Sequence, residues 1–225
     1  MKAFNLKDFT RITCEDDCHL AVRNVLAGEY EVSFYCSPET PVVVLDIGAN
    51  VGAFAIWALQ KWNPEAIYCF EPMERNYHQL MTNILHLPPI RTKFILTMKA
   101  IEAPSNKLYL DKTSTASASF YPDLFCNEIT ENFVETESVS ADSLPDCTII
   151  KVDTEGCELP ILTKYLETHE EHPAVIMFEF HREDDRRKLD DLMYNYHYHL
   201  SSGEIKSSVL GTLKYFHDRV PIIWT

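Results

Sequence analysis

Three short segments of the chain carry side chains that could do chemistry, and each follows an apolar run. The first segment, residues 46–52, follows the run Val42–Leu45. It begins with Asp46 and contains Gly48 and Gly52. This order is typical of a buried strand that passes through a tight loop into a helix, which is how α/β folds build nucleotide pockets. The glycines could also only turn the chain, but the agreement of the acid, the glycines and both flanking elements favours a pocket.

The loop of this first segment also indicates which nucleotide it suits. A dinucleotide pyrophosphate needs the pattern G-x-G-x-x-G, whose second glycine lets the backbone approach the phosphates. Here Asn50 takes that position. The acid at the strand end, Asp46, suits a ligand with a cationic amino group, and S-adenosylmethionine (SAM) carries both an ammonium and a sulfonium group. The loop therefore favours SAM over a nicotinamide dinucleotide.

A second acid, Glu71, ends the next apolar run and precedes Pro72. In nucleotide-binding α/β folds, an acid at this place accepts hydrogen bonds from ribose hydroxyls. A solvated acid at the start of the following helix would also explain Glu71. Its pairing with Asp46 favours the ribose role.

The second segment, Lys151–Glu158, gathers carboxylates beside one lysine. Lys151 and Asp153 are two apart on a predicted strand, so they share a face. Glu155 and Glu158 follow at the same corner. Such an arrangement is costly unless it holds a cation or tunes a proton acceptor. A capped helix start explains Glu158 well but explains Asp153 poorly.

The third segment ends the next strand, where Glu179 and His181 share one face. If this strand neighbours the strand of Lys151, then Lys151, Asp153, Glu179 and His181 converge at one rim of the sheet. A histidine near a carboxylate is a natural general base, because its pKa lies close to neutral. A lone histidine is usually structural, so the role depends on the convergence.

The elements that must position these segments alternate along the chain. Strands are predicted over 42–46, 66–70, 93–98, 148–152 and 174–180, and helices over 51–61, 74–85, 158–166 and 184–194. Alternating strands and helices imply a mostly parallel sheet with helices on both faces. We expect a single α/β domain over 1–225, with an N-terminal cap over 1–40 and a core over 41–225.

The remaining stretches are less regular. The cap is expected to be helical, with a stripe from Leu20 to Leu26 and a short strand over 30–35. Short strands are predicted over 107–110 and 133–139, around a loop at 113–119. The last part is expected to form antiparallel strands over 196–200, 209–216 and 221–224.

Composition narrows the class of partner. The formal net charge is −14, with 34 acidic and 20 basic side chains. Nucleic acid and anionic membranes are therefore unexpected partners, since both need a basic footprint. The odd number of cysteines, 7, favours a reduced, cytoplasmic protein. Cys14, Cys18 and His19 lack a second ligand pair, so zinc is not expected there.

Three of these stretches resemble the FkbM-type family of SAM-dependent (class I) methyltransferases. Leu45–Gly52 resembles the SAM-binding loop of that family, and Phe70–Pro72 resembles its segment with the ribose-binding acid. Ile150–Glu158 is similar to its hallmark, K-[IV]-D-x-E-G-x-E. The hallmark is specific, whereas the first loop alone marks only the wider class. The resemblance covers roughly residues 28–220.

The resemblance implies a Rossmann-like class I methyltransferase fold, with a seven-stranded sheet in the order 3-2-1-4-5-7-6 and strand seven antiparallel. It implies SAM as cofactor and a hydroxyl oxygen of a small molecule, a sugar or a natural-product intermediate, as acceptor. Ser117–Ser119 lies where family members often carry a small serine segment facing the site. Lys99–Glu102 departs from the usual turn of the family, which leaves the adenine contacts open.

The expected site residues follow from the residue patterns and from the family resemblance together. The cofactor set is Asp46, Gly48, Ala49, Asn50, Val51, Gly52, Glu71, Pro72, Lys99, Ala100 and Asp153. The catalytic set is Asp153, Glu155, Lys151, Glu179 and His181. A magnesium ion at Asp153, Glu155 and Glu179 is permitted but not required.

Several alternatives stay open. The same fold supports methyl transfer to nitrogen or carbon, and a non-catalytic module that binds SAM or a partner. A nicotinamide oxidoreductase is a third option, against which Asn50 counts. The sequence does not decide the oligomeric state, a homodimer being one option, or whether the chain is a fragment of a larger synthase.

Overall fold

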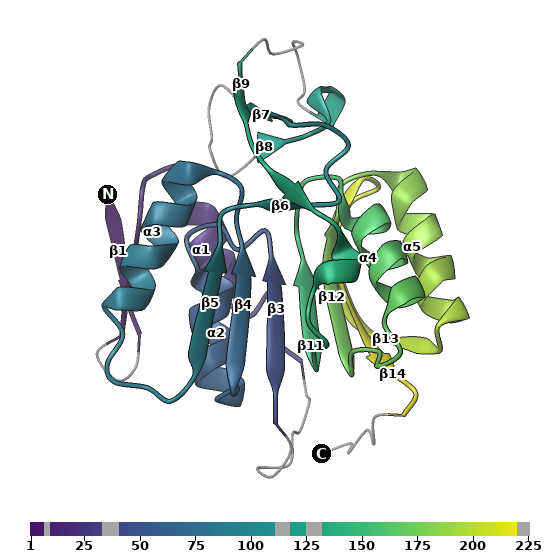
Figure 1. Cartoon of the computed structure of the whole chain (residues 1–225), viewed down its shortest axis with the longest axis horizontal. Helices are drawn as coiled ribbons and strands as arrows, with labels where there is room; N and C mark the ends of the chain where they lie inside the picture. The colour runs from purple at the N-terminus through teal and green to yellow at the C-terminus, as the bar shows by residue number, and fades with distance from the viewer. Residues whose placement is uncertain (7–9, 33–40, 111–117, 125–131, 220–225) are drawn as a thin grey trace.

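A seven-stranded sheet forms the centre of the molecule (Figure 1). The computed structural model describes residues 1–6, 10–32, 41–110, 118–124 and 132–219. The strands of the central sheet are β3 (Val43–Ile47), β4 (Ala66–Phe70), β5 (Lys93–Thr97), β11 (Ile149–Val152), β12 (Val175–Phe180), β13 (Tyr198–Ser207) and β14 (Leu210–His217).

The order of these strands across the sheet is β5-β4-β3-β11-β12-β14-β13. Counted along the chain, this is the order 3-2-1-4-5-7-6. Strand β14 is antiparallel to both β12 and β13, while the other pairs are parallel. The predicted fold class and strand order are therefore confirmed.

Helices cover both faces of the sheet. They are α1 (His19–Leu26), α2 (Ala53–Trp62), α3 (Glu74–Leu85), α4 (Glu158–Thr168) and α5 (Glu183–Asn195). Along β3, Leu45 and Ile47 belong to the apolar cluster that includes residues of α4 and α5, whereas Val44 belongs to the cluster that includes residues of α1, α2 and α3. Successive side chains of a strand point to opposite faces of the sheet, so β3 contributes residues to two separate apolar cores.

Smaller strands lie beyond the carboxyl ends of the central strands, at the top of Figure 1. Strands β7 (Lys107–Leu110), β8 (Ala118–Ser119) and β9 (Phe133–Glu135) form one small antiparallel sheet. A two-residue strand β6 (Ala100–Ile101) pairs in parallel with β10 (Ser138–Val139). The single strand expected over 133–139 is therefore two strands that pair with different partners.

The N-terminal region contains the expected helix, α1 (His19–Leu26), but it also contains strands that were not expected. Strands β1 (Lys2–Asn5) and β2 (Arg11–Cys14) form an antiparallel hairpin before α1. Residues Ile12 and Cys14 are buried, so β2 turns one side to the core. The strands were missed because β2 is held against α3, 70 positions further along the chain, and no local pattern marks that contact. Residues 30–32 are not in a strand, and the rest of the strand expected over 30–35 lies outside the described residues.

The C-terminal strands are confirmed with different bounds. Strand β13 begins at Tyr198 and extends to Ser207, because Tyr196 is the cap of α5. The strand expected over 221–224 lies outside the described residues. Within the part of the chain that is described, no helix has the length and apolarity needed to span a membrane.

Candidate active site

A cavity of about 590 Å³ opens at the carboxyl ends of the central strands. Its walls come from the loops after β3, β4, β11 and β12, from α1 and the turn that follows it, and from the small sheet above. Ligands of α/β sheets bind at this edge. Its volume is within the range typical of small-molecule and cofactor sites.

The glycine loop after β3 bends the backbone sharply toward β11. Gly48 has φ +78°, and a Cβ there would lie 1.8 Å from the backbone oxygen of Asp153. Gly52 has φ +85° and precedes α2, and its Cβ would lie 2.5 Å from Cδ1 of Leu80. Both positions therefore require glycine, which confirms that this segment is a tight loop between strand and helix.

Every backbone N–H of this loop already has a partner inside the protein. The amides of Gly48 and Ala49 both donate to the carbonyl of Phe70 (2.9 and 3.0 Å). The remaining donors are Asn50 N to Glu71 Oε2, Val51 N to Asn50 Oδ1 and Gly52 N to the Ala49 carbonyl. Phosphate-binding loops need free N–H groups pointing at the ligand. This loop therefore does not fit a diphosphate.

Beneath the loop, Asp46 and Lys151 form a buried pair that we call the floor pair. The Lys151 ammonium lies 3.2 Å from Oδ1 of Asp46 and donates to the Gly48 carbonyl at 2.6 Å. The Asp46 side chain is 0% exposed. Burial acts to lower the pKa of Lys151, but the charges of Asp46 and Asp153 hold it above its usual value. The pair supports the loop from below.

Glu71 reaches the cavity from the end of β4. Its carboxylate accepts hydrogen bonds from the amides of Asn50 (2.8 Å) and Met73 (3.0 Å). Burial raises the pKa of Glu71 to about 7, although these two backbone hydrogen bonds act to lower it. Glu71 is thus tied to the glycine loop while it lines the cavity, as a ribose-binding acid would have to be.

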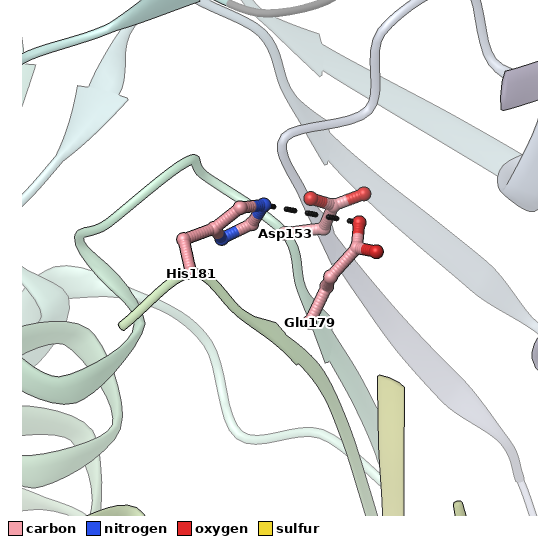
Figure 2. Close-up of side chains that lie close together, drawn as sticks. All are labelled: Asp153, Glu179 and His181. Atoms are coloured by element: carbon pink, nitrogen blue, oxygen red, sulfur yellow. Dashed lines mark ion pairs between the residues drawn. The ribbon is translucent and has the colours of Figure 1, made fainter. Parts of the chain in front are cut away.

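Four side chains at the opposite side of the cavity form what we call the rim cluster: Asp153, Glu155, Glu179 and His181. His181 Nε2 lies 3.1 Å from Glu155 and 3.9 Å from Glu179. Figure 2 shows Asp153, Glu179 and His181 turned toward one another. The predicted convergence of β11 and β12 is observed, because the two strands are direct neighbours.

Two carboxylates of the rim cluster, Glu155 and Glu179, have pKa values raised to near neutral. Burial raises the pKa of Glu155 to about 7, with Asp153 and Glu179 adding to the effect and His181 opposing it. Burial and the Asp153 charge raise the pKa of Glu179 to about 7. Burial alone would lower the pKa of His181, but the carboxylates of Glu155 and Glu158 raise it well above its usual value. Groups with such pKa values are typical of acid–base sites.

Glu158 fixes the turn that carries Asp153 and Glu155. Its carboxylate accepts the amides of Thr154 (2.8 Å) and Gly156 (3.2 Å) at the start of α4. Burial acts to raise the pKa of Glu158, but His181 and these hydrogen bonds lower it below its usual value. Glu158 lies in the first turn of α4, as the helix-start interpretation expects, but its hydrogen bonds go to amides of the turn before the helix.

The other predicted residues fall into two groups. Ala49, Asn50, Val51, Pro72, Lys99 and Ala100 line the cavity with Gly48 and Lys151. Asp46 and Gly52 do not line it. Direct contact of Asp46 with a ligand's ammonium group is not supported by this placement, because its carboxylate is sealed beneath the loop. The Lys99 ammonium pairs with Glu137 at 2.8 Å.

The roof of the cavity comes from the small sheet. Leu108, Ala118, Phe120 and Leu124 line the cavity. The Ser119 hydroxyl donates to the backbone carbonyl of Glu155, which ties the roof to the rim. Of the serine segment that the resemblance implies, Ala118 lines the cavity, Ser119 is buried behind the wall, and Ser117 lies outside the described residues.

Sequence reasoning missed three residues that lie at the rim. Tyr30 donates to Asp153 Oδ2 at 3.2 Å, and Lys206 lies between Glu29 (2.7 Å) and Glu179 (2.8 Å). Glu29 and Tyr30 come from the turn after α1, and Lys206 comes from β13. No local pattern marks them, because their partners are distant in the sequence.

The rim also contains donors of the types that divalent cations bind. One ligand atom each of Asp153, Glu179 and His181 lies within 4.8 Å of the others, so His181 replaces Glu155 in the expected magnesium set. However, Glu179 already contacts Lys206 at 2.8 Å, and Asp153 contacts Lys151 at 3.7 Å. These two lysines already offset part of the negative charge of the rim carboxylates, so a metal ion is given no role in the reaction.

Comparison with known proteins supports the fold. No family model matches the chain, and no curated protein matches it significantly in sequence. Among solved structures, a chain of a fibrillarin/Nop5p complex matches with a TM-score of 0.54 at 12% identity, covering 96% of this chain and 97% of the other.

Two further structures are similar at lower scores. The precorrin-6y C5,15-methyltransferase of Geobacter metallireducens has a TM-score of 0.48 at 11% identity, covering 96% of this chain and 94% of the other. The magnesium protoporphyrin IX methyltransferase of Synechocystis PCC 6803, solved with bound SAM, has a TM-score of 0.47 at 9% identity, covering 89% of this chain and 77% of the other. Together with the strand order, the first of the three similarities shows that this chain has the Rossmann-like methyltransferase fold.

Proposed function

We propose that this protein is a SAM-dependent methyltransferase of the FkbM type that methylates a hydroxyl group of a small molecule. The observation that carries the proposal is one cavity with two chemically different sides. One side is a glycine loop with no free amide and a tethered Glu71, and the other is the rim cluster.

The loop side fits the cofactor. SAM has ribose hydroxyls and a methionine part but no phosphate, so it does not need the free amides that this loop lacks. Glu71 would accept the ribose hydroxyls, and Gly48–Val51 would line the methionine part. The floor pair would act indirectly, by holding the Gly48 carbonyl in place. The loop counts against a nicotinamide dinucleotide for the same reason.

The rim side supplies the acid–base chemistry. When bound, SAM supplies an electrophilic methyl group, and the acceptor oxygen must lose its proton. Asp153 would orient the acceptor hydroxyl and take that proton, with Glu155, Glu179 and His181 sharing charge around it. Alignment of the reacting groups is worth about 7–11 kcal/mol, and a positioned base about 10²–10⁴-fold in rate.

The charge of the rim favours a small, uncharged acceptor. Glu29, Asp153, Glu155 and Glu179 line the acceptor side with Lys206 and His181. Carboxylates are good acceptors for hydroxyl donors, whereas a polyanion such as RNA would be repelled. A polyhydroxylated molecule, such as a sugar, therefore fits this side best.

Binding and transfer experiments test the proposal separately. Calorimetry should show binding of S-adenosylhomocysteine but not of NADH. Transfer of a tritiated methyl group should then be followed with a panel of monosaccharides, phenols and primary amines. Binding of NADH alone would refute the cofactor assignment, and transfer only to amines would refute the hydroxyl acceptor. Cofactor binding without methyl transfer to any compound of the panel would favour a non-catalytic module.

The role of Asp153 has its own test. Asp153→Asn should lower turnover by about 10²–10⁴-fold while S-adenosylhomocysteine still binds. Asp142→Asn is the matched control, because Asp142 lies outside the cavity and pairs with Lys164 at 4.0 Å. Wild-type turnover in Asp153→Asn would show that this carboxylate has no catalytic role.

A further inference from the structure

The turn after α1 brings two side chains into the rim, although it lies in the N-terminal region and outside the core expected over 41–225. Helix α1 ends at Leu26, and Gly28 follows with φ +100°. The amide of Glu29 donates to the Asn24 carbonyl at 3.1 Å, and the amide of Glu31 donates to the Gly28 carbonyl at 2.9 Å. These bonds close a tight turn, which directs Glu29 and Tyr30 into the cavity wall.

Tyr30 is held firmly in this place. It is 1% exposed, and its ring packs edge-on against Phe54 of α2 with centroids 5.2 Å apart. The Lys151 ammonium lies 5.9 Å above the same ring. A tyrosine buried in this way needs a partner for its hydroxyl, and that partner is Oδ2 of Asp153 at 3.2 Å.

The contacts of Asp153 are unequal between its two oxygens. The Tyr30 hydroxyl and the Lys151 ammonium (3.7 Å) both approach Oδ2. Asp153 lines the cavity, and none of the described residues donates a hydrogen bond to its Oδ1. The hydrogen bond from Tyr30 and the nearby Lys151 cation both act on Oδ2, so they restrict rotation of the carboxylate and leave the other oxygen for a ligand.

Glu29 holds the second carboxylate of the rim through Lys206. Glu29 Oε1 accepts from Lys206 at 2.7 Å and from Thr212 at 3.2 Å. The same ammonium contacts Glu179 at 2.8 Å. The backbone carbonyl of Glu29 accepts from Lys214 at 2.7 Å. One two-residue stretch of the turn therefore contacts two of the three rim carboxylates, directly at Asp153 and through a lysine at Glu179.

We propose that Tyr30 is a positioning residue of the active site, whose hydroxyl orients Asp153 so that Oδ1 faces the acceptor hydroxyl. The inference rests on the proposed methyl transfer. It assigns to the turn after α1 a part in catalysis as well as in closing the cavity. Tyr30 does not touch the reacting atoms in this scheme, and it acts through Asp153.

A double-mutant cycle tests this scheme in turnover. Tyr30→Phe should lower kcat by about tenfold, the loss expected for one buried hydrogen bond, with little change in KM for SAM. In an Asp153→Asn background, the same substitution should have no further effect. Additive effects of the two substitutions, or wild-type kcat in Tyr30→Phe, would overturn the inference.

A matched control separates positioning from stability. Tyr198 is 3% exposed, and its hydroxyl donates to the Pro173 carbonyl at 2.6 Å, at the start of β13. Tyr198→Phe removes a comparable buried hydrogen bond outside the cavity, so it should lower the melting temperature but not kcat. An equal loss of kcat in both variants would reduce Tyr30 to a structural residue.

A crystallographic experiment needs no acceptor, so it separates this inference from the proposed function. In Tyr30→Phe crystals soaked with S-adenosylhomocysteine, the Asp153 carboxylate should rotate away from its wild-type position. An unchanged Asp153 position would overturn the positioning role even if the wild-type protein transfers methyl groups. A rotated Asp153 in a protein that transfers no methyl group would retain the positioning contact and refute the proposed function alone.

Discussion

Asp46 and Asp153 lie at the ends of neighbouring strands and contact the same lysine, yet their surroundings differ. Lys151 lies 3.2 Å from Asp46 and 3.7 Å from Asp153. The side chain of Asp46 is 0% exposed, whereas that of Asp153 is 26% exposed. The floor pair is therefore sealed and compensated, while the rim opens to the cavity.

Access to solvent separates the two carboxylates, because Asp46 is sealed while Asp153 can meet a ligand. A buried ion pair contributes little net stability, but removing one partner leaves an uncompensated charge. A carboxylate at the cavity wall can instead exchange its contacts with those of a ligand. The floor pair should therefore respond to mutation mainly in stability, and the rim mainly in turnover.

The largest effect should follow from breaking the floor pair. Lys151→Met leaves Asp46 buried without a cation and should lower the free energy of unfolding by about 3–5 kcal/mol, measured by urea denaturation. The double variant Asp46→Leu/Lys151→Met should recover most of that loss. Lys206→Met at the rim is the control and should cost less, because its side chain is 28% exposed, whereas that of Lys151 is 4% exposed. Equal losses at both lysines would remove the distinction between floor and rim.

The glycine loop above the floor pair should be the next most sensitive. Gly48→Ala places a Cβ 1.8 Å from the backbone oxygen of Asp153 at a positive φ, so we expect a loss of more than about 1–3 kcal/mol and weak cofactor binding. Gly52 has a similar φ, but an added Cβ there would meet the flexible end of Leu80, so Gly52→Ala should lose less stability. Thermal unfolding and calorimetry with S-adenosylhomocysteine would measure both. The reverse ranking would contradict the close approach of the loop to β11.

Titration of Glu71 should produce a moderate effect on binding. Its pKa is raised to about 7 by burial, so it is mostly protonated at pH 6 and mostly ionised at pH 8. The ionised form accepts hydrogen bonds from ribose hydroxyls better, so affinity for S-adenosylhomocysteine should rise about tenfold from pH 6 to pH 8. Glu71→Gln should flatten that dependence. A steep dependence in Glu71→Gln would assign the titration to another group.

The smallest effect should come from removing metal ions. Lys206, Lys151 and protonated His181 already offset the charge of the rim carboxylates. Dialysis against EDTA should therefore change turnover by less than about twofold, as measured by methyl transfer. A loss that added magnesium restores would instead place a cation among Asp153, Glu179 and His181.

The core elements could be predicted because their signals are local. The apolar run at β3 and the glycines after it need only neighbouring residues to be recognised. The predicted bounds of the core strands agree with the structure to within one residue. The order of the strands came from the resemblance to a family, since strand pairing itself is not local.

The N-terminal region shows where this reasoning stops. The hairpin β1–β2 is stabilised partly by contact with α3, where the Thr13 amide donates to Asn83 at 2.9 Å. Tyr30 meets Asp153 across 123 positions of the chain. No residue near position 13 or 30 indicates these partners, so the hairpin and the rim contact of Tyr30 could not be predicted from the sequence.

The sequence by itself determined the chemistry that is available: a glycine loop without a phosphate pattern, and acids at the ends of successive strands. Only the tertiary structure decided which acid is sealed and which faces the cavity, because burial depends on what packs above each strand end. It seals Asp46 beneath the loop, and it brings Tyr30 and Lys206 to the rim. The residue types were therefore readable along the chain, but their roles depend on distances in space that one-dimensional spacing does not encode.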